Sequence, residues 1–220
     1  MPHDSDDEIT LLTADGLTLA GDLCVAGRTR AGAVVCHPHP AYGGDRHNAV
    51  VDALYRTLLA AGVAALRFDF RPLGPRTATR EGIAERADIV AALHRLAAEI
   101  GQAVPLFLVG YSFGADVALA VGDDLHAGWA AVAPPFRFSG PARPGLGDRR
   151  PVLVLAPQHD QFAPPYWVGK ATHSWPDVTV ETVPMTDHLL AGATAQVAQT
   201  VTAWVLYRVE PERGVRRGAR

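Results

Sequence analysis

The stretch PLFLVGYSFGADVALAVG, residues 105–122, decides the fold of this chain. An apolar run typical of a buried strand leads into GYSFG and then into an alanine-rich segment typical of a helix, so a sharp turn must lie at Ser112. In the pattern G-x-S-x-G, glycines flank the serine because the backbone is crowded there. The hydroxyl then lies beside free N–H groups at a helix start, which favour negative charge. Ser112 is therefore a candidate nucleophile.

The motif alone is weak evidence, because it occurs by chance in about one chain in thirteen of this length. The rest of the chain supports it, since apolar runs and helical stretches alternate as in a mostly parallel sheet with helices on both faces. We expect eight strands, near residues 8–13, 17–25, 31–38, 63–68, 105–109, 128–132, 151–155 and 178–183. We expect helices over residues 48–61, 82–99, 112–121, 166–173 and 190–207. The first two strands flank the turn signal Ala-Asp-Gly and should form an antiparallel hairpin.

The chain of 220 residues, 48% of them hydrophobic, fits one α/β domain over residues 1–208 without a cap domain. The basic tail, residues 209–220, should be frayed. The loop over residues 134–150 is long enough to be functional or mobile. Cys24 and Cys36 lie in expected strands, so we interpret them as buried thiols rather than a disulfide or a metal site.

The net charge of -3 offers no electrostatic reason for a nucleic acid or an anionic membrane as partner. The first ten residues, MPHDSDDEIT, are acidic and polar, unlike a secretory signal, and no run of about 18 apolar residues follows. We therefore expect a cytoplasmic protein.

A serine hydroxyl is a poor nucleophile without a base, so Ser112 requires a histidine and an orienting carboxylate later in the chain. The expected strand PVLVLA is followed by PQHDQF, which contains Asp160, and VTVETV is followed by PMTDH, which contains His188. Each of these residues therefore lies just after the carboxyl end of a strand, at the edge of the sheet where open parallel sheets bind ligands. His159, His173 and Asp187 are weaker candidates for the same roles.

The loop after the third expected strand, HPHPAYGGDRHN, should supply part of an oxyanion hole. Proline has no N–H to donate, so we expect the backbone N–H of His39 to act beside that of Phe113. One alternative is a metal site formed by His37, His39, Asp45 and His47, although no helical spacing relates them. Another is that His37 only binds loop backbone.

These motifs resemble the α/β-hydrolase superfamily, and more narrowly its small, capless bacterial branch with an H-P-H-P loop. The resemblance covers nearly the whole chain, through HPHPAYGGDRHNAVV, RFDFRPLG, GYSFGA, HDQFAPP and DHLL. It implies the α/β-hydrolase fold and serine-hydrolase chemistry. One departure is the stretch Arg71 to Arg76, RPLGPR, where relatives have glycine and then a G-x-S turn; it should shape a different pocket.

The sequence thus predicts hydrolysis of a small or medium ester or thioester through an acyl-enzyme on Ser112, with no cofactor. Aromatic side chains near the site should form the pocket, although each could instead pack in the core. These are Tyr42, Phe113, Phe136, Phe138, Phe162 and Trp167. The alternatives are acyl transfer, a cyclase or lyase step at the same site, or a silent binding protein of the same fold.

Overall fold

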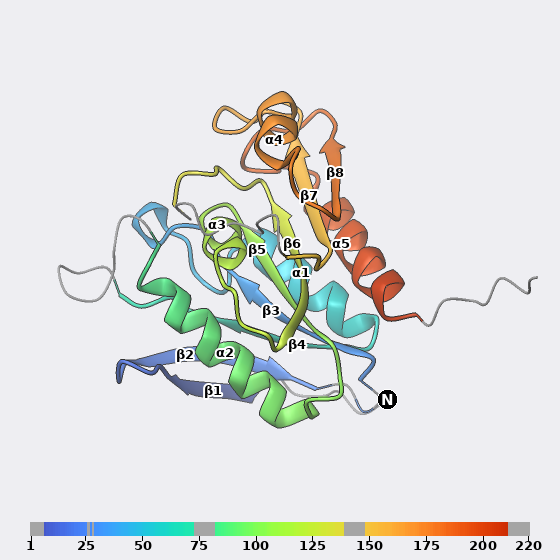
Figure 1. Ribbon diagram of the computed structural model, residues 1–220. Coiled ribbons are helices and arrows are strands. Elements are labelled where there is room, and N and C mark those ends of the chain that lie inside the picture. Colours follow the sequence, from blue (N-terminus) through green and yellow to red (C-terminus); the bar gives the residue numbers. More distant parts are fainter. Residues whose placement is uncertain (1–6, 26, 28, 73–81, 139–147, 211–220) are drawn as a thin grey trace, which may run out of the picture.

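A computed structural model describes residues 7–25, 27, 29–72, 82–138 and 148–210 (Figure 1). Its strands form one eight-stranded sheet in the order β1-β2-β4-β3-β5-β6-β7-β8. The strands are β1 (Asp7–Leu12), β2 (Thr18–Cys24), β3 (Ala31–Cys36), β4 (Val63–Phe68), β5 (Leu106–Tyr111), β6 (His126–Val132), β7 (Val152–Pro157) and β8 (Val178–Val183). The pairs β1–β2 and β2–β4 are antiparallel and all others are parallel. The predicted sheet and its edge hairpin are confirmed.

Helices cover both faces of the sheet, as predicted. They are α1 (Ala49–Ala60), α2 (Glu85–Ile100), α3 (Phe113–Leu119), α4 (Pro165–Thr172) and α5 (Thr194–Val209), with a short 3-10 helix, η1 (Pro40–Tyr42). In Figure 1, α2 and α3 lie in front of the sheet, and α1 and α5 lie behind it. No cap rises over the sheet within the described ranges.

The central strands are buried on both sides, which explains their continuous apolar sequences. In β3, Val34 and Cys36 pack on the side of α2 and α3, whereas Ala33 and Val35 pack on the side of α1 and α5. Successive side chains of a strand point to opposite faces, so one strand contributes to two cores. This rigid double-sided sheet holds the carboxyl ends of β3, β5, β7 and β8 at one edge.

The last helix begins later than predicted, at Thr194 rather than Leu190. The backbone of Leu190 has a φ of 56° and that of Gly192 a φ of 78°, both in the left-handed region that a helix excludes. These residues form turns instead, and the turns return the chain from the sheet edge to α5.

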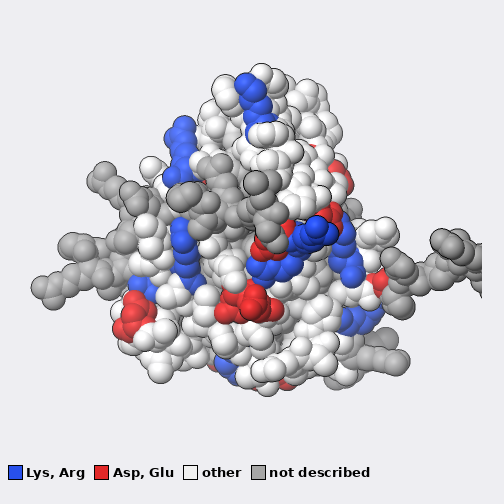
Figure 2. All heavy atoms as spheres, viewed as in Figure 1, with Lys and Arg blue, Asp and Glu red and all other residues white. Residues whose placement is uncertain are grey.

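Some predictions fall partly outside the described residues. Val209 ends α5, and the predicted tail lies outside the described residues from 211 onward. Of the loop 134–150, residues 139–147 also lie outside them. None of the described helices has the length and apolar character needed to cross a membrane. On the face shown in Figure 2, acidic and basic side chains are interspersed.

Candidate active site

Ser112 occupies the turn between β5 and α3, as predicted. Its φ of 54° and ψ of -119° place it in a strained conformation for a residue with a side chain. The backbone N–H of Ser112 donates to the carbonyl of Val132 at 2.9 Å, which ties the turn to β6. A Cβ at Gly110 would lie 2.5 Å from the backbone N of Ala115, and one at Gly114 would lie 2.5 Å from the carbonyl oxygen of Cys36. Both glycines are therefore needed for the turn.

The structure brings Ser112, His188 and Asp160 together in one hydrogen-bonded series. The Ser112 Oγ lies 2.8 Å from Nε2 of His188, and Nδ1 of His188 lies 2.8 Å from Oδ2 of Asp160. Nδ1–H donates to the carboxylate, so Nε2 is the nitrogen that can accept the proton of Ser112. The tautomer required of a general base is therefore the one that the carboxylate stabilises.

Asp160 follows β7 and is buried, with 3% of its surface exposed. Its Oδ1 accepts hydrogen bonds from the backbone N–H groups of Phe162 at 2.7 Å and Ala163 at 3.2 Å. Burial alone would raise the pKa of Asp160, but the hydrogen bond from His188 and the two N–H groups outweigh it and lower that pKa. The carboxylate therefore stays ionised beside His188.

His188 lies in the loop after β8 and is held from two sides. Tyr111 donates its hydroxyl to the backbone carbonyl of His188 at 2.8 Å, and the ring of Phe162 meets the imidazole edge to face at 4.7 Å. Burial, with the charges of Asp160 and Asp187, raises the pKa of Tyr111 to about 12, so its phenol remains a donor. The role of Tyr111, the last residue of β5, was not predicted.

The weaker candidates occupy other places. The backbone N–H of His159 donates to Thr186, and Nδ1 of His173 lies 2.8 Å from the carbonyl of Lys170. Asp187 accepts from the N–H of Leu189 at 3.0 Å, which caps a turn. These residues therefore serve local loop structure.

The H-P-H-P loop places His39 beside the turn that contains Ser112. Nδ1 of His39 accepts from the N–H of Ala41 at 3.0 Å and caps η1, and its ring centroid lies 4.6 Å from that of Phe113. Phe113 is the first residue of α3, a position whose N–H has no acceptor within the helix. The close approach of this loop requires glycine at position 44, because a Cβ there would lie 2.0 Å from the carbonyl oxygen of Pro38.

His37 forms hydrogen bonds with loop backbone, as the second alternative for this loop predicted. The N–H of Phe70 donates to its Nε2 at 2.9 Å, so Nδ1 carries the proton and donates to the carbonyl of Pro38 at 2.6 Å. With both nitrogens engaged and its pKa lowered by burial, His37 cannot bind a metal without breaking this structure. No cluster of three or more His, Cys, Asp or Glu suited to a metal ion occurs within the described ranges.

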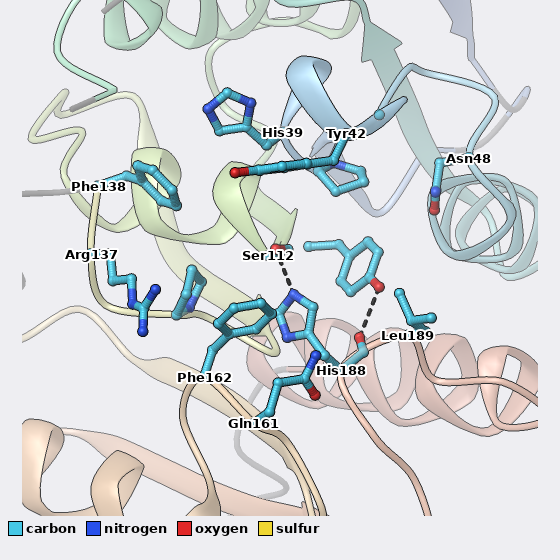
Figure 3. A pocket seen from close by; sticks show the side chains of 14 residues that line it. His39, Tyr42, Asn48, Ser112, Arg137, Phe138, Gln161, Phe162, His188 and Leu189 are labelled. Atoms are coloured by element: carbon cyan, nitrogen blue, oxygen red, sulfur yellow. Dashed lines mark hydrogen bonds between the residues drawn. The ribbon is translucent and has the colours of Figure 1, made fainter. Parts of the chain in front are cut away.

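A cleft of about 360 Å³ lies directly over Ser112 and His188 (Figure 3). Three of the predicted aromatic residues line it, namely Tyr42, Phe138 and Phe162. Sequence reasoning missed other lining residues, and these are Asn48, Tyr111, Pro135, Arg137, Gln161 and Leu189. Except for Tyr111 in β5, these residues lie outside the strands and α-helices, where no periodic pattern would have indicated them.

Three other predicted aromatic residues are not among those that line the cleft. Phe113 is buried in the core between α3 and the sheet. Phe136 turns toward Trp175, with ring centroids 6.3 Å apart, because its φ of 55° reverses the chain there. Trp167 is 57% exposed on α4 and packs against Tyr166.

Two buried polar side chains anchor the segments that follow β6 and β4. Asp116 on α3 accepts from the N–H groups of residues 136–138, at 2.9, 2.7 and 3.0 Å. Arg71, after β4, is 2% exposed and pairs with Asp88 of α2 and with Asp15. The remainder of the unusual stretch that begins at Arg71, from residue 73 to 76, lies outside the described residues.

Comparison with solved structures identifies proteins of the same fold. An α/β serine hydrolase homologue from Coxiella burnetii is 22% identical, with 93% of this chain and 100% of that chain covered and a TM-score of 0.79. A serine hydrolase without a lid from Xanthomonas campestris is 24% identical, over 96% and 98% of the chains, with a TM-score of 0.79. The esterase Pf2001 from Pyrococcus furiosus is 17% identical, over 94% and 93%, with a TM-score of 0.75. The chain therefore has the α/β-hydrolase fold.

More narrowly, it has the capless form of that fold, which the sequence resemblance predicted. No protein-family model matches the chain. Among curated proteins, an uncharacterized protein of Rickettsia prowazekii is 38% identical over 88 residues. That match covers 40% of this chain and 37% of the relative.

Proposed function

We propose that this protein is a serine hydrolase that cleaves a carboxylic ester or thioester of small to medium size. The observation that carries the proposal is the unbroken hydrogen-bonded series from Ser112 through His188 to Asp160, at a strained turn that opens into a cleft. The esterase among the structures of the same fold agrees with ester chemistry. The cleft volume accommodates an acyl group of modest length.

In the proposed mechanism, His188 accepts the proton of Ser112 as Oγ attacks the carbonyl carbon of the substrate. Asp160 stabilises the imidazolium that results. The backbone N–H groups of Phe113 and His39 then donate to the oxyanion, whose negative charge the start of α3 also favours. His188 returns the proton to the leaving alcohol or thiol.

The acyl-enzyme on Ser112 is then released by water. His188 removes a proton from the water, the new hydroxide attacks the acyl carbon, and the carboxylic acid leaves as Oγ is reprotonated. Every proton transfer in this cycle uses Nε2 of His188, so the mechanism requires no cofactor.

Labelling with a fluorophosphonate probe tests the proposal, because the probe phosphonylates an activated serine. We expect labelling of the wild type, none of Ser112→Ala, and labelling of His188→Ala slowed by about 10³-fold or more. Thermal unfolding of each variant checks that it folds. A wild type labelled no better than Ser112→Ala would overturn the proposal. A series of nitrophenyl esters of increasing acyl length then identifies the preferred acyl group.

A further inference from the structure

The cleft over Ser112 carries one permanent charge. Of the described residues that line it, only Arg137 is a lysine, arginine, aspartate or glutamate, and the remaining walls are apolar or neutral polar apart from histidines. Figure 3 shows Arg137 on the same side of the cleft as Phe138, with its side chain directed toward Phe162. Among these lining residues, Arg137 is therefore the one with a permanent charge that a negative group could pair with.

The guanidinium of Arg137 has no carboxylate partner in the part of the chain that the structure describes; its Cζ lies 5.2 Å from the ring centroid of Phe162. Most other described arginines form ion pairs with Asp or Glu. These are Arg30, Arg46, Arg56, Arg67, Arg71, Arg95, Arg150 and Arg208. The arginine that lines the cleft thus differs from them in keeping its hydrogen-bond donors available for a ligand.

The backbone that carries Arg137 is held in place by a buried group. Asp116 accepts the N–H of Arg137 at 2.7 Å and the N–H groups of both neighbours. Asp116 is itself in the first turn of α3, the helix that directly follows Ser112. The position of Arg137 is therefore defined relative to the nucleophile, even though its side chain is exposed to solvent.

The guanidinium also lies close to the reacting groups. The ring of Phe162 contacts Arg137 on one side at 5.2 Å and the imidazole of His188 on another at 4.7 Å. The distance from the guanidinium carbon to the centre of the imidazole therefore cannot exceed the sum of these two distances by way of the Phe162 ring. A substrate group separated from the ester carbonyl by several bonds can span that distance.

We propose that the natural substrate carries an anionic group, a carboxylate or a phosphate, several bonds from the scissile ester, and that Arg137 binds it. This inference rests on the proposed function and specifies its substrate class. A guanidinium forms paired hydrogen bonds with either oxyanion, and such charge-assisted bonds are among the stronger ones available to a protein. Phe162 supports the guanidinium by a cation–π contact while the anion is bound.

The test compares substrates that differ by one charge. The neutral reference is 4-nitrophenyl hexanoate; the 4-nitrophenyl monoester of adipic acid has a carboxylate on the acyl chain, and 3-carboxy-4-nitrophenyl hexanoate has one on the leaving group. For each substrate, the ratio of kcat/KM between wild type and variant is measured, because this ratio cancels the intrinsic reactivity of the ester.

We expect Arg137→Gln to lower kcat/KM about 10-fold or more for at least one anionic ester and less than about 2-fold for the neutral ester. Arg137→Lys should retain part of the preference, since it keeps the charge but not the paired geometry. The matched control is Arg95→Gln, which removes the same charge from an ion pair on α2 and should leave all three ratios near one. The ester that responds shows whether the anion belongs to the acyl or the leaving part.

Equal effects of Arg137→Gln on neutral and anionic esters would overturn the inference, and would leave Arg137 as a support for Phe162. Neutral-ester turnover that depends on Ser112, without any anion preference, would refute only the inference. If none of the esters is turned over and the probe does not label Ser112, the proposed function fails and the inference fails with it.

Discussion

Two loops border the cleft, and one buried carboxylate organises each of them. Asp116 uses its oxygens to bind three backbone N–H groups of the loop after β6, residues 136–138. Asp160 binds two N–H groups of the loop after β7 with Oδ1, but its Oδ2 accepts from His188. The same arrangement therefore holds a loop at the cleft in one case and orients the proposed base, His188, in the other. In Asp160, one carboxylate oxygen, Oδ2, is engaged by the side chain of His188.

The largest expected effect comes from Asp160→Asn. The amide can no longer hold Nδ1–H of His188 in place, so the imidazole loses the tautomer that accepts a proton from Ser112. We expect kcat for 4-nitrophenyl butyrate to fall about 10³- to 10⁴-fold, as measured by release of nitrophenol. The matched control is Asp187→Asn, next to His188, which should change kcat less than about 2-fold. Equal losses in both variants would contradict the role given to Asp160.

A smaller effect is expected from Asp116→Asn, which leaves the triad intact. An amide nitrogen facing backbone N–H groups cannot accept from them, so the loop carrying Arg137 and Phe138 should loosen. We expect the free energy of unfolding to fall by about 1–3 kcal/mol and KM to rise about 10-fold, with kcat changed far less. Urea unfolding and steady-state kinetics measure the two quantities.

Asp123→Asn is the matched control for Asp116→Asn, because Asp123 also caps a loop, through the N–H of Leu125, but that loop does not line the cleft. It should reduce stability without changing KM. If Asp116→Asn lowers kcat as strongly as Asp160→Asn, the two carboxylates do not differ in role, one holding the loop 136–138 and the other orienting His188.

The smallest effect is expected at Asp15, an exposed carboxylate outside both loops. Its hydrogen bond from Arg71 lowers the pKa of Asp15 to about 2. The folded protein thus binds a proton at the Asp15 carboxyl less tightly than the unfolded chain does. The stabilisation of the fold by the Asp15–Arg71 pair is therefore present above about pH 4 and disappears as the pH falls to about 2. Asp15→Asn should lower the urea midpoint slightly at pH 6, and the difference from wild type should shrink toward pH 2. A difference that is constant over this range would contradict the assignment.

The sheet and the order of the triad could be predicted because they depend on local patterns. Buried parallel strands are continuous apolar runs, and Asp160 and His188 directly follow two of them. The start of the last helix could not be predicted in the same way. The left-handed turns at Leu190 and Gly192 follow from how the His188 loop returns to α5, a tertiary requirement.

The cleft was predicted less well than the triad for a similar reason. An aromatic residue in a loop can face the cleft, as Phe162 does, or the core, as Phe136 does, and composition does not distinguish the two. Asp116 and the lining residue Arg137 were missed because their positions depend on contacts across about twenty positions in the chain, between a helix start and a loop. No spacing rule in a single sequence relates such residues.

The positive φ of Ser112 has a consequence for attempts to make this protein more heat-resistant. Glycine adopts such a conformation without steric cost, so Ser112→Gly would relieve strain on the order of 1 kcal/mol while removing the proposed nucleophile. Selection of variants for stability alone would therefore tend to replace Ser112. Under the proposed function, activity and thermal stability compete at one backbone angle, and engineering of the chain has to gain its stability at other positions.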